Sequence, residues 1–375
     1  MPHWARSFIF VAMTTNTRTH WGLNFNSGPS ILPKEVFEQA SAAVLDYRGT
    51  GLSILEIGHR TPLFQEVIDE ARALIKELME LDDDHEVLFL HGGATTQFFQ
   101  VPMNLLNPGE KAAYLDCGTW GTKAIKEAKN FGEVLVLGSS GDKKYTYIPK
   151  GYTIPEDLRY VHITSNNTIE GTQQFDWPET SAPLIVDMSS DILSRKLDFN
   201  RFGLIYAGAQ KNIGAAGVTL VVVNRNLLGQ VKRPLPAMMD YRNHIENGSM
   251  LNTPPVFAIY VCLLTLRWLK SMGGIGAIEP VNEQKARILY NTLESIPMYK
   301  PTVAIEDRSL MNVVWVLEDP RLDKELLGLA EKEGISGIQG HRIAGGFRAS
   351  LYNAMPLDGV ETLVGLLKDF AAKKG

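Results

Sequence analysis

The chain has 375 residues, of which 45% are hydrophobic and 21% are charged, and its formal net charge is -5. The length predicts about two domains, and the composition is ordinary for a globular protein. Because no basic excess is present to neutralise phosphates, the charge argues against a nucleic-acid partner. Cys117 and Cys262 show neither a CxxC spacing nor a Cys/His grouping, so we expect buried thiols, no disulfide framework and no metal site.

The N-terminal residues 1–22 contain one short apolar run, residues 8–13, after a single arginine. This run is too short to span a membrane, and no convincing small-residue cleavage pattern follows it. We interpret residues 1–22 as a poorly ordered or locally packed extension, with a targeting peptide as the alternative. The compartment predicted is the cytoplasm, without membrane association.

Two stretches near the start of the remaining chain carry groups that suit an anion. A polar loop at residues 26–33 offers the hydroxyl of Ser27 and the unhindered backbone N–H of Gly28. His59 and Arg60 stand just before a long amphipathic helix, where their donors and the helix dipole favour a phosphate or carboxylate. Taken alone, an ordinary loop and a surface pair are the alternatives.

A more informative unit, EVLFLHGGATTQFFQ, joins an apolar strand, a glycine turn, two threonines and an amphipathic helix. The backbone N–H groups and hydroxyls of such a turn form an anion cradle. The unit lacks both GxxxxGK[ST] and GxGxxG, so it is neither a P-loop nor a dinucleotide fingerprint.

Three further residues follow predicted strands. Trp120 stands in a glycine-rich turn, where the flanking glycines favour a stacking surface over a core plug. Thr168 belongs to a polar cluster, and Asp187 ends the apolar strand at residues 184–186. A carboxylate at the C-terminal end of a buried parallel strand lies where open α/β sheets bind ligands. The alternation of strands and helices predicts a mostly parallel sheet covered on both faces.

Lys211 stands between two apolar runs, residues 204–206 and 218–223, that are typical of short buried strands. Small residues on both sides of Lys211 leave room for a large flat ligand against the backbone. This stretch alone leaves open whether Lys211 is a presented amine or a turn lysine that points to solvent.

Further along the chain, a turn at Asn252 and Thr253 is followed by a long apolar helix that we expect to end at residues 273–274. His341, Arg342 and Arg348 flank a glycine pair and form a second cluster of anion-binding donors, with a solvated basic loop as the alternative.

The predicted α/β organisation has three parts: an extension at 1–22, a large domain at 23–275, and a smaller α+β domain at 276–375. Residues 23–34 are expected to pack with the small domain.

A presented amine, a strand-end carboxylate, an anion cradle, an aromatic ring and several arginines match the needs of pyridoxal 5'-phosphate. A carboxylate keeps the ring nitrogen of this cofactor protonated by charge pairing. The lysine, once displaced by substrate, serves as the base that transfers a proton.

Several long motifs resemble those of the phosphoserine aminotransferases, class V aminotransferases within the fold-type I pyridoxal-phosphate enzymes. In order they are NFNSGPSILP, GHR at 58–60, MSSDILSR, AGAQKNIGAAGVT, NGSMLNTPPVFAIY and GHRIAGGFRASLYNAMP, and they span residue 24 to the last predicted helix. The resemblance implies a seven-stranded-type sheet in the large domain and a homodimer with its active sites at the subunit interface.

The resemblance also implies a reaction. It is the reversible transamination of 3-phosphohydroxypyruvate with glutamate, which gives phosphoserine and 2-oxoglutarate in serine biosynthesis. Whether 4-phosphohydroxy-threonine, in pyridoxine biosynthesis, is a further substrate stays open.

By the resemblance, Lys211 bonds the cofactor aldehyde, Asp187 pairs with the pyridinium nitrogen, and Trp120 stacks on the ring. The other residues implied at the cofactor are Ala94, Thr95, Thr168 and Gln210, with Asn252 and Thr253 from the neighbouring subunit. Arg348 is implied as the clamp for the substrate α-carboxylate. The substrate-binding residues also include Ser27 and, as the cup for the substrate phosphate, His59, Arg60, His341 and Arg342, the last two expected from the partner chain.

Two positions depart from the family pattern. Many members have HGGGRGQF where this chain has HGGATTQF, so Thr95 replaces an arginine of the cofactor loop, and QGHR with Gln339 replaces the frequent KGHR. The alternatives are another class V enzyme, such as an alanine-glyoxylate aminotransferase or a cysteine desulfurase, and a non-catalytic α/β binding protein. A desulfurase needs a mobile cysteine, and neither Cys117 nor Cys262 is well placed for that.

Overall fold

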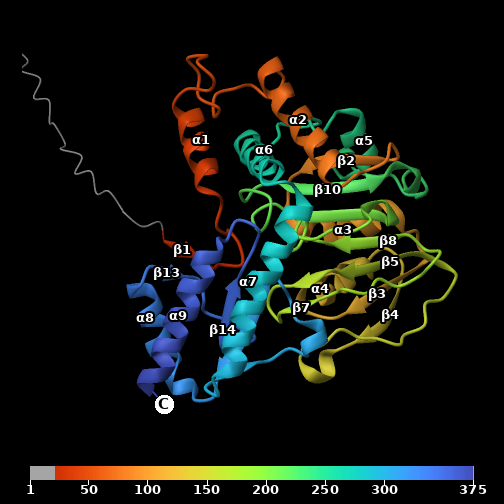
Figure 1. Cartoon of the computed structure of the whole chain (residues 1–375). Helices are drawn as coiled ribbons and strands as arrows, with labels where there is room; N and C mark the ends of the chain where they lie inside the picture. Colours follow the sequence, from red (N-terminus) through yellow and green to blue (C-terminus); the bar gives the residue numbers. More distant parts are fainter. Residues whose placement is uncertain (1–21, 375) are drawn as a thin grey trace, which may run out of the picture.

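The computed structural model describes residues 22–374, so the interpretation of residues 1–22 as an extension lies, except for residue 22, outside the described part. Its central feature is a seven-stranded sheet in which β10 runs antiparallel to both of its neighbours and all other neighbours are parallel (Figure 1). The strands, in sheet order, are β2 (His85–Leu90), β10 (Thr219–Asn224), β9 (Phe202–Gly208), β8 (Leu184–Asp187), β5 (Leu158–Thr164), β3 (Lys111–Asp116) and β4 (Glu133–Ser139). The predicted α/β fold with a mostly parallel sheet is confirmed.

Both faces of this sheet are covered by helices, which explains why its central strands are continuous apolar runs. On β10, Leu220 and Val222 pack into the cluster on one face, while Val221 and Val223 pack into the cluster on the other. The first face is covered by α1 (Lys34–Leu45), α2 (Pro62–Leu78) and α6 (Val256–Ser271), and the second by α3 (Gly93–Leu105), α4 (Thr119–Ala128) and the short α5 (Tyr241–Glu246).

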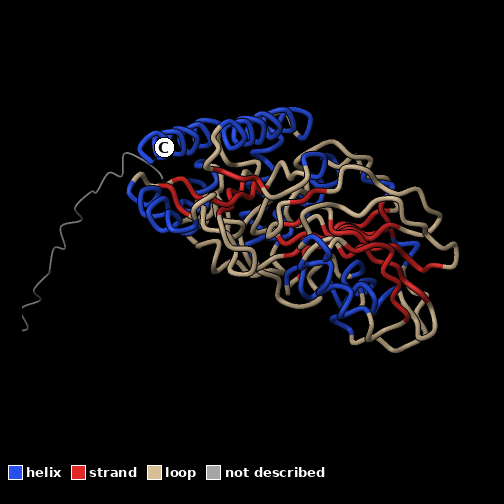
Figure 2. The backbone as a smooth tube through the Cα atoms, turned by 90° about the horizontal axis from the view of Figure 1, so that it is seen from below, coloured by secondary structure: helices blue, strands red, loops and turns tan. Residues whose placement is uncertain are grey.

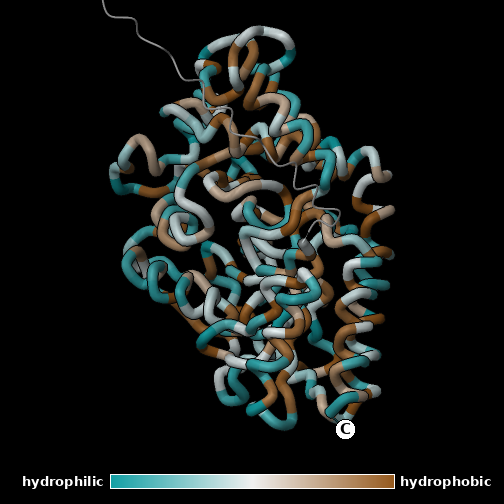
Figure 3. The backbone as a smooth tube through the Cα atoms, turned by 90° about the vertical axis from the view of Figure 1, so that its left-hand side faces the viewer, coloured by the Kyte–Doolittle hydropathy of each residue, from teal (hydrophilic) through white to brown (hydrophobic). Residues whose placement is uncertain are grey.

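The C-terminal part has its own sheet and its own hydrophobic cluster, and Figure 2 shows its strands as a group separate from the large sheet. Its elements are α7 (Ile275–Ser295), the antiparallel strands β11 (Tyr299–Pro301), β12 (Asn312–Leu317) and β14 (Phe347–Ser350), and helices α8 (Asp323–Lys332) and α9 (Leu357–Lys374). Hydrophobic and hydrophilic residues alternate along α9, which ends at the C mark in Figure 3, because one side of this helix faces the cluster. The domain boundary proposed near residue 275 falls at the turn between α6 and α7.

Two short strand pairs lie outside the two larger sheets. Strand β1 (Leu23–Asn24) pairs in parallel with β13 (Ile335–Ser336) of the C-terminal part. A two-residue-strand hairpin, β6 (Asn166–Asn167) and β7 (Thr172–Gln173), follows β5. The chain after β1 then crosses to the large sheet, where the backbone N–H of Ser30 donates to Gln210 O at 3.0 Å.

Both cysteines, Cys117 and Cys262, are buried free thiols, as predicted. In the described part of the chain, no single helix is long and apolar enough to cross a membrane. Helices α6 and α7 pass that test of length and composition only as a pair, and they are bent by 88° with respect to each other.

Candidate active site

Lys211 lies on the connection between β9 and β10, as the sequence predicts, and its side chain is half-buried. The two antiparallel strands close this connection, and the Ala209 N–H donates to Val218 O at 3.1 Å. Helix α6 passes so close that a Cβ on Gly214 would lie 2.5 Å from Cys262 Sγ. From the other side, Ser30 Oγ donates to the backbone oxygen of Lys211. The lysine backbone is thus held between a core helix and the loop at residues 26–33.

Asp187 is the last residue of β8, and 4% of it is exposed. Its Oδ1 accepts from the Ser189 N–H at 2.9 Å, and its backbone oxygen accepts from Ser165 Oγ at 2.9 Å. Burial raises the pKa of Asp187, and the positive charge of Lys211 opposes that rise. Burial likewise lowers the pKa of Lys211, and the charge of Asp187 opposes that fall. The two groups are close enough to stabilise each other's charged forms, and a lowered pKa makes the free amine more accessible.

Trp120 is the second residue of α4, so the predicted turn position is wrong. The chain turns at Gly118, the residue before the helix, where a Cβ would lie 2.4 Å from Asn167 Oδ1. The indole Nε1 donates to Thr168 Oγ1 at 3.0 Å, and the Lys211 Nζ lies 5.5 Å from the ring centroid. The indole is therefore held by a hydrogen bond and faces the lysine amine.

Arg348 extends from β14 of the C-terminal part to this same group, and 8% of it is exposed. Its Nη1 donates to Thr168 O at 3.0 Å, whereas its buried Nε has no hydrogen-bond partner. Burial lowers the pKa of Arg348, and the charge of Arg348 in turn lowers the pKa of Lys211. A buried guanidinium with an unused donor is suited to bind an incoming anion.

His341 lies among further positive charges around Arg348. Burial lowers the pKa of His341, and the charges of Arg348, Arg342 and Lys123 lower it further. Lys123 Nζ itself lies 4.5 Å from the centroid of the Trp120 ring. Several cations of one chain thus gather around the edge of the site, which favours an anionic ligand there.

The glycine turn after β2 leads into α3, and Ala94 and Thr95 occupy the first turn of this helix. Gly92 has a φ of 93°, and a Cβ there would overlap the Thr96 side chain at 1.8 Å, so this turn requires glycine. The first N–H groups of a helix have no partner within the helix and suit a phosphate. The backbone N–H groups of this turn do not depend on the side chain at Thr95, which stands where the family pattern often has an arginine.

Asn252 and Thr253 lie beside this turn in the same chain. His91 Nε2 is 3.1 Å from Thr253 O, and Asn252 Nδ2 donates to the same oxygen at 3.3 Å. No hydrogen bond or ion pair within residues 22–374 joins either side chain to Lys211 or Asp187.

His59 and Arg60 stand just before α2. His59 lines a cavity of about 540 Å³ together with Gly217, Thr253 and Phe257, and its buried Nε2 has no partner. Arg60 is exposed. Across the described chain, no hydrogen bond or ion pair connects these two residues to the positive region around Arg348. Contacts within the described part of one chain therefore do not join His59 and Arg60 to the Arg348 group.

Sequence reasoning missed the residues that hold the site in place. Ser30 binds the Lys211 backbone, and Ser189 and Ser165 hold Asp187. Tyr352 donates its hydroxyl to Ser27 O at 2.8 Å, which fixes the loop that carries Ser27. Ser30, Ser189 and Tyr352 stand inside motifs already singled out in the sequence, but hydroxyl residues in a motif carry no sign of which distant atom they bind.

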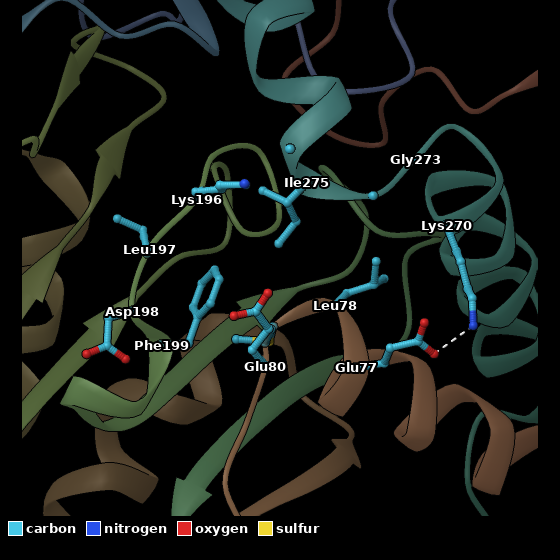
Figure 4. A pocket seen from close by; sticks show the side chains of 13 residues that line it. Glu77, Leu78, Glu80, Lys196, Leu197, Asp198, Phe199, Lys270, Gly273 and Ile275 are labelled. Carbon is cyan, nitrogen blue, oxygen red and sulfur yellow. Dashed lines mark hydrogen bonds and ion pairs between the residues drawn. The ribbon is translucent and has the colours of Figure 1, made fainter.

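The cleft in Figure 4 is a different feature, with a volume of about 750 Å³. It lies between the end of α2, residues 196–199 and the turn between α6 and α7. Its lining carries both charges, with Glu77 and Lys270 paired at 2.7 Å, and it contains none of the residues described above. We assign no part of the active site to it.

An amine and a buried carboxylate that influence each other's pKa beside a fixed indole, at the carboxyl edge of a mostly parallel sheet, fit a pyridoxal-phosphate enzyme of fold type I. Residues 23–363 match the family model of the class V aminotransferases. Curated phosphoserine aminotransferases from Flavobacterium johnsoniae and Listeria monocytogenes are 55% and 49% identical over 93% and 94% of this chain and 99% and 97% of their own. The solved phosphoserine aminotransferase of Bacillus circulans subsp. alkalophilus superposes with a TM-score of 0.92 at 43% identity, covering 95% of this chain and 99% of its own.

This chain therefore belongs to the phosphoserine aminotransferase family of class V aminotransferases, and it is a pyridoxal-phosphate-dependent aminotransferase. A relative from Trichomonas vaginalis, 34% identical with a TM-score of 0.88 over 93% of this chain and all of its own, was solved with pyridoxal phosphate bound. The groups described here, an amine of lowered pKa, a buried carboxylate and the first N–H groups of a helix, fit this cofactor.

Proposed function

We propose that this enzyme transfers the amino group of phosphoserine reversibly to 2-oxoglutarate. The products are 3-phosphohydroxypyruvate and glutamate. The observation that carries this proposal is the buried Arg348 beside Lys211, with His341, Arg342 and Lys123 next to it. A substrate with a carboxylate at one end and a phosphate at the other matches two adjacent cationic groups. The shared name of the relatives supports the same substrate and a role in serine biosynthesis. We assign the enzyme to the cytoplasm on its ordinary globular composition.

In this mechanism Arg348 binds the α-carboxylate of the substrate. Its charge and its unused Nε–H are available to an oxygen anion, while Nη1 stays on Thr168 O. A carboxylate held on this guanidinium brings the substrate amine towards Lys211, whose charge already interacts with Arg348. Orientation of this kind is a large part of catalysis because it replaces a free encounter by a fixed geometry.

Lys211 moves the proton. When bound, the cofactor supplies an electron sink for the charge that develops at the substrate Cα. Lys211 Nζ accepts the proton from that carbon, and its lowered pKa keeps the amine available as a base. Asp187, buried at the end of β8, supplies the negative charge that pairs with the protonated ring nitrogen. Trp120 provides the flat surface on which the ring stacks, with Thr168 holding the indole.

The cofactor phosphate is proposed to bind at the first turn of α3. The residues concerned are Ala94 and Thr95 from this turn, Gln210 beside Lys211, and Asn252 and Thr253 of the neighbouring subunit.

We propose a homodimer that shares its active sites. The lack of a hydrogen bond or ion pair between His59 or Arg60 and the Arg348 group in the described part of one chain supports a site that a second copy completes. Leu45 and Leu55, on the segment that leads to His59, are 83% and 62% exposed, as expected for side chains that a partner covers. His59 and Arg60 of one copy then meet His341 and Arg342 of the other copy, next to the Arg348 of that second copy, to bind the substrate phosphate. In this arrangement the partner chain supplies His59 and Arg60, whereas the resemblance implied His341 and Arg342. Ser27 closes the site from the loop next to Lys211.

A coupled assay with glutamate formation as readout tests the proposal. Phosphoserine should be used far better than serine, alanine or cysteine, since only phosphoserine fills both cationic groups. Preference for alanine would favour an alanine-glyoxylate aminotransferase, and sulfide release from cysteine would favour a desulfurase. Including 4-phosphohydroxy-threonine in the same assay determines whether the site accepts one more hydroxylated carbon between the two anionic ends.

A further inference from the structure

Two buried asparagines, Asn166 and Asn312, join the β6–β7 hairpin to strand β12 of the C-terminal part. Asn166 Nδ2 donates to Asn312 Oδ1 at 2.7 Å across a sequence separation of 146 residues. Only 3% of Asn166 and 0% of Asn312 are exposed. A buried amide destabilises the fold unless its donors and acceptor are hydrogen-bonded. The other contacts of Asn166 and Asn312 therefore decide whether this pair stabilises the contact between hairpin and strand.

Each of the two amides is fully hydrogen-bonded. Asn166 also donates to Ser190 Oγ at 2.8 Å and accepts from Ser309 Oγ at 2.5 Å. Asn312 donates to Ser350 Oγ at 2.9 Å and to the Tyr352 hydroxyl at 3.4 Å. Because an amide has two N–H donors and one oxygen, these contacts fix its orientation. A completely satisfied buried network specifies one arrangement of the elements it joins.

The contacts of Asn312 lead directly to Arg348. Asn312 lies opposite Ser350 in the β12–β14 register, and Val314 lies opposite Arg348. Residues two apart in a strand share a face, so Ser350 and Arg348 point to the same side of β14.

The hairpin that carries Thr168 lies on this same side. A Cβ on Gly171 would be 2.8 Å from Val314 Cγ2, so the hairpin touches the strand. Thr168 O then accepts from Arg348 Nη1 at 3.0 Å. The asparagine pair thus sets how far the guanidinium lies from the hairpin that holds the Trp120 indole.

We propose that Asn312 is a positioning residue that sets the Arg348 guanidinium for the α-carboxylate of the substrate. It acts through Ser350 on the strand that carries Arg348 and through Asn166 on the hairpin that binds Arg348. Through Tyr352 it also holds the loop of Ser27. Asn312 itself touches no substrate. This inference rests on the proposed function, since it assigns Arg348 to the substrate carboxylate.

The substitution Asn312→Asp tests the role with little change in volume. It keeps the oxygen that accepts from Asn166 but replaces both N–H donors by an acceptor. The Tyr352 hydroxyl would then turn from Ser27 O to the new carboxylate, and Ser350 would lose its donor. Ser350→Ala is the second variant, which removes one contact and is used if the first variant does not fold. Asn104→Asp is the matched control, because Asn104 is an equally buried amide whose Nδ2 donates to the Gln100 and Met239 carbonyls, away from this network.

The measurement compares two unreactive ligands of the holoenzyme by calorimetry. 3-Phosphoglycerate carries both a phosphate and a carboxylate, whereas glycerol 3-phosphate carries the phosphate alone. We expect Asn312→Asp to weaken binding of 3-phosphoglycerate about tenfold, the effect of one lost well-placed hydrogen bond, and to change glycerol 3-phosphate binding by less than about twofold. With phosphoserine, KM should rise more than kcat falls.

The results distinguish failure of the positioning role of Asn312 from failure of the proposed function. Equal weakening of both ligands, no weakening of either, or the same ligand selectivity in Asn104→Asp would overturn the positioning role. If the wild-type enzyme fails to transaminate phosphoserine, the proposed function itself fails, whatever the variants do.

Discussion

The indole nitrogen of Trp120 donates to Thr168 Oγ1 at 3.0 Å, while the backbone oxygen of the same threonine accepts from Arg348 at 3.0 Å. One residue therefore orients both the proposed stacking surface for the cofactor ring and the proposed clamp for the substrate carboxylate. Substitutions that remove only the hydrogen bond between the Trp120 indole and the Thr168 hydroxyl test the first effect, because they leave the Thr168 backbone oxygen to Arg348.

Trp120→Phe keeps an aromatic ring but removes the N–H donor, and Thr168→Val removes the acceptor with little change of shape. We expect each variant to raise the dissociation constant of pyridoxal phosphate about two- to tenfold, the effect of one hydrogen bond. The double variant should lose no more than the worse single variant, because both remove the same bond. Cofactor release followed by visible absorbance provides the measurement, and additive losses would show that the bond does not hold the indole.

Lys211→Ala should lower kcat by about two to four orders of magnitude, the usual effect of losing a proton-transfer base. The same variant should lose the absorbance of the covalently attached cofactor, a readout that does not depend on turnover. Lys270→Ala is the control, because that exposed lysine pairs with Glu77 at the cleft of Figure 4. Full activity of Lys211→Ala would end the catalytic assignment.

Arg60→Ala should raise KM for phosphoserine about 10- to 100-fold with a much smaller change in kcat, since a charged hydrogen bond contributes about 1.5 to 3 kcal/mol. Steady-state kinetics measure both constants. Arg321→Ala, which removes another exposed arginine that pairs with Asp319, should leave both unchanged. Equal falls in kcat and kcat/KM for Arg60→Ala would contradict its place in the substrate phosphate cup.

Lys285, in α7, is completely buried, and its Nζ donates to the carbonyls of Leu351, Tyr352 and Met355 at 2.8, 2.8 and 3.0 Å. Burial lowers the pKa of Lys285 to about 7. A lysine in the unfolded chain has a pKa near about 10.4, so between these values the unfolded chain binds more protons. The free energy of unfolding contributed by Lys285 should then rise with pH, by about 1.4 kcal/mol per pH unit above about pH 7.

Urea unfolding of the wild type and of Lys285→Met at about pH 7 and about pH 9 isolates this contribution. The wild type should gain stability relative to the variant as the pH rises. A difference that stays constant would show that the three carbonyls keep the ammonium charged throughout this range.

Gly214→Ala should lower the free energy of unfolding by about 1 to 3 kcal/mol, because its Cβ would lie 2.5 Å from Cys262 Sγ in the helix behind Lys211. Gly365→Ala is the matched control in α9, where a Cβ meets open space and the substitution should stabilise by about 0.5 to 1 kcal/mol. Thermal or urea unfolding compares the two variants. Gly214→Ala with wild-type stability would show that α6 can move away from the lysine segment.

Much of the fold follows from the sequence, because strands buried on both faces are continuous apolar runs and the polar residues that end them stand out. Asp187 and Lys211 were recognisable for this reason. The direction of β10 was not, since a strand buried on both faces has the same composition in either direction. Trp120 was placed in a turn because Gly118 was not recognised as the residue that starts α4.

The contacts that support the site could not be predicted from the sequence for another reason. Asn166 and Asn312 are ordinary polar residues in the sequence, and only the folded chain brings them within 2.7 Å of each other. Ser30 and Tyr352 likewise act on residues far away in the chain. Sequence reasoning finds the groups with distinctive chemistry and misses those that orient them.

The pairing of β1 with β13 has a consequence for synthesis of the protein. Ile335 is made 312 positions after its partner Leu23 (335 − 23), so β1 cannot pair until the C-terminal part has emerged from the ribosome. The loop at residues 26–33, which carries Ser27 and holds the Lys211 backbone through Ser30, stays untethered on that side until then. A nascent chain that has already folded its large sheet would therefore still lack a finished active site, and catalytic competence should begin only once the segment around Ile335 has been made.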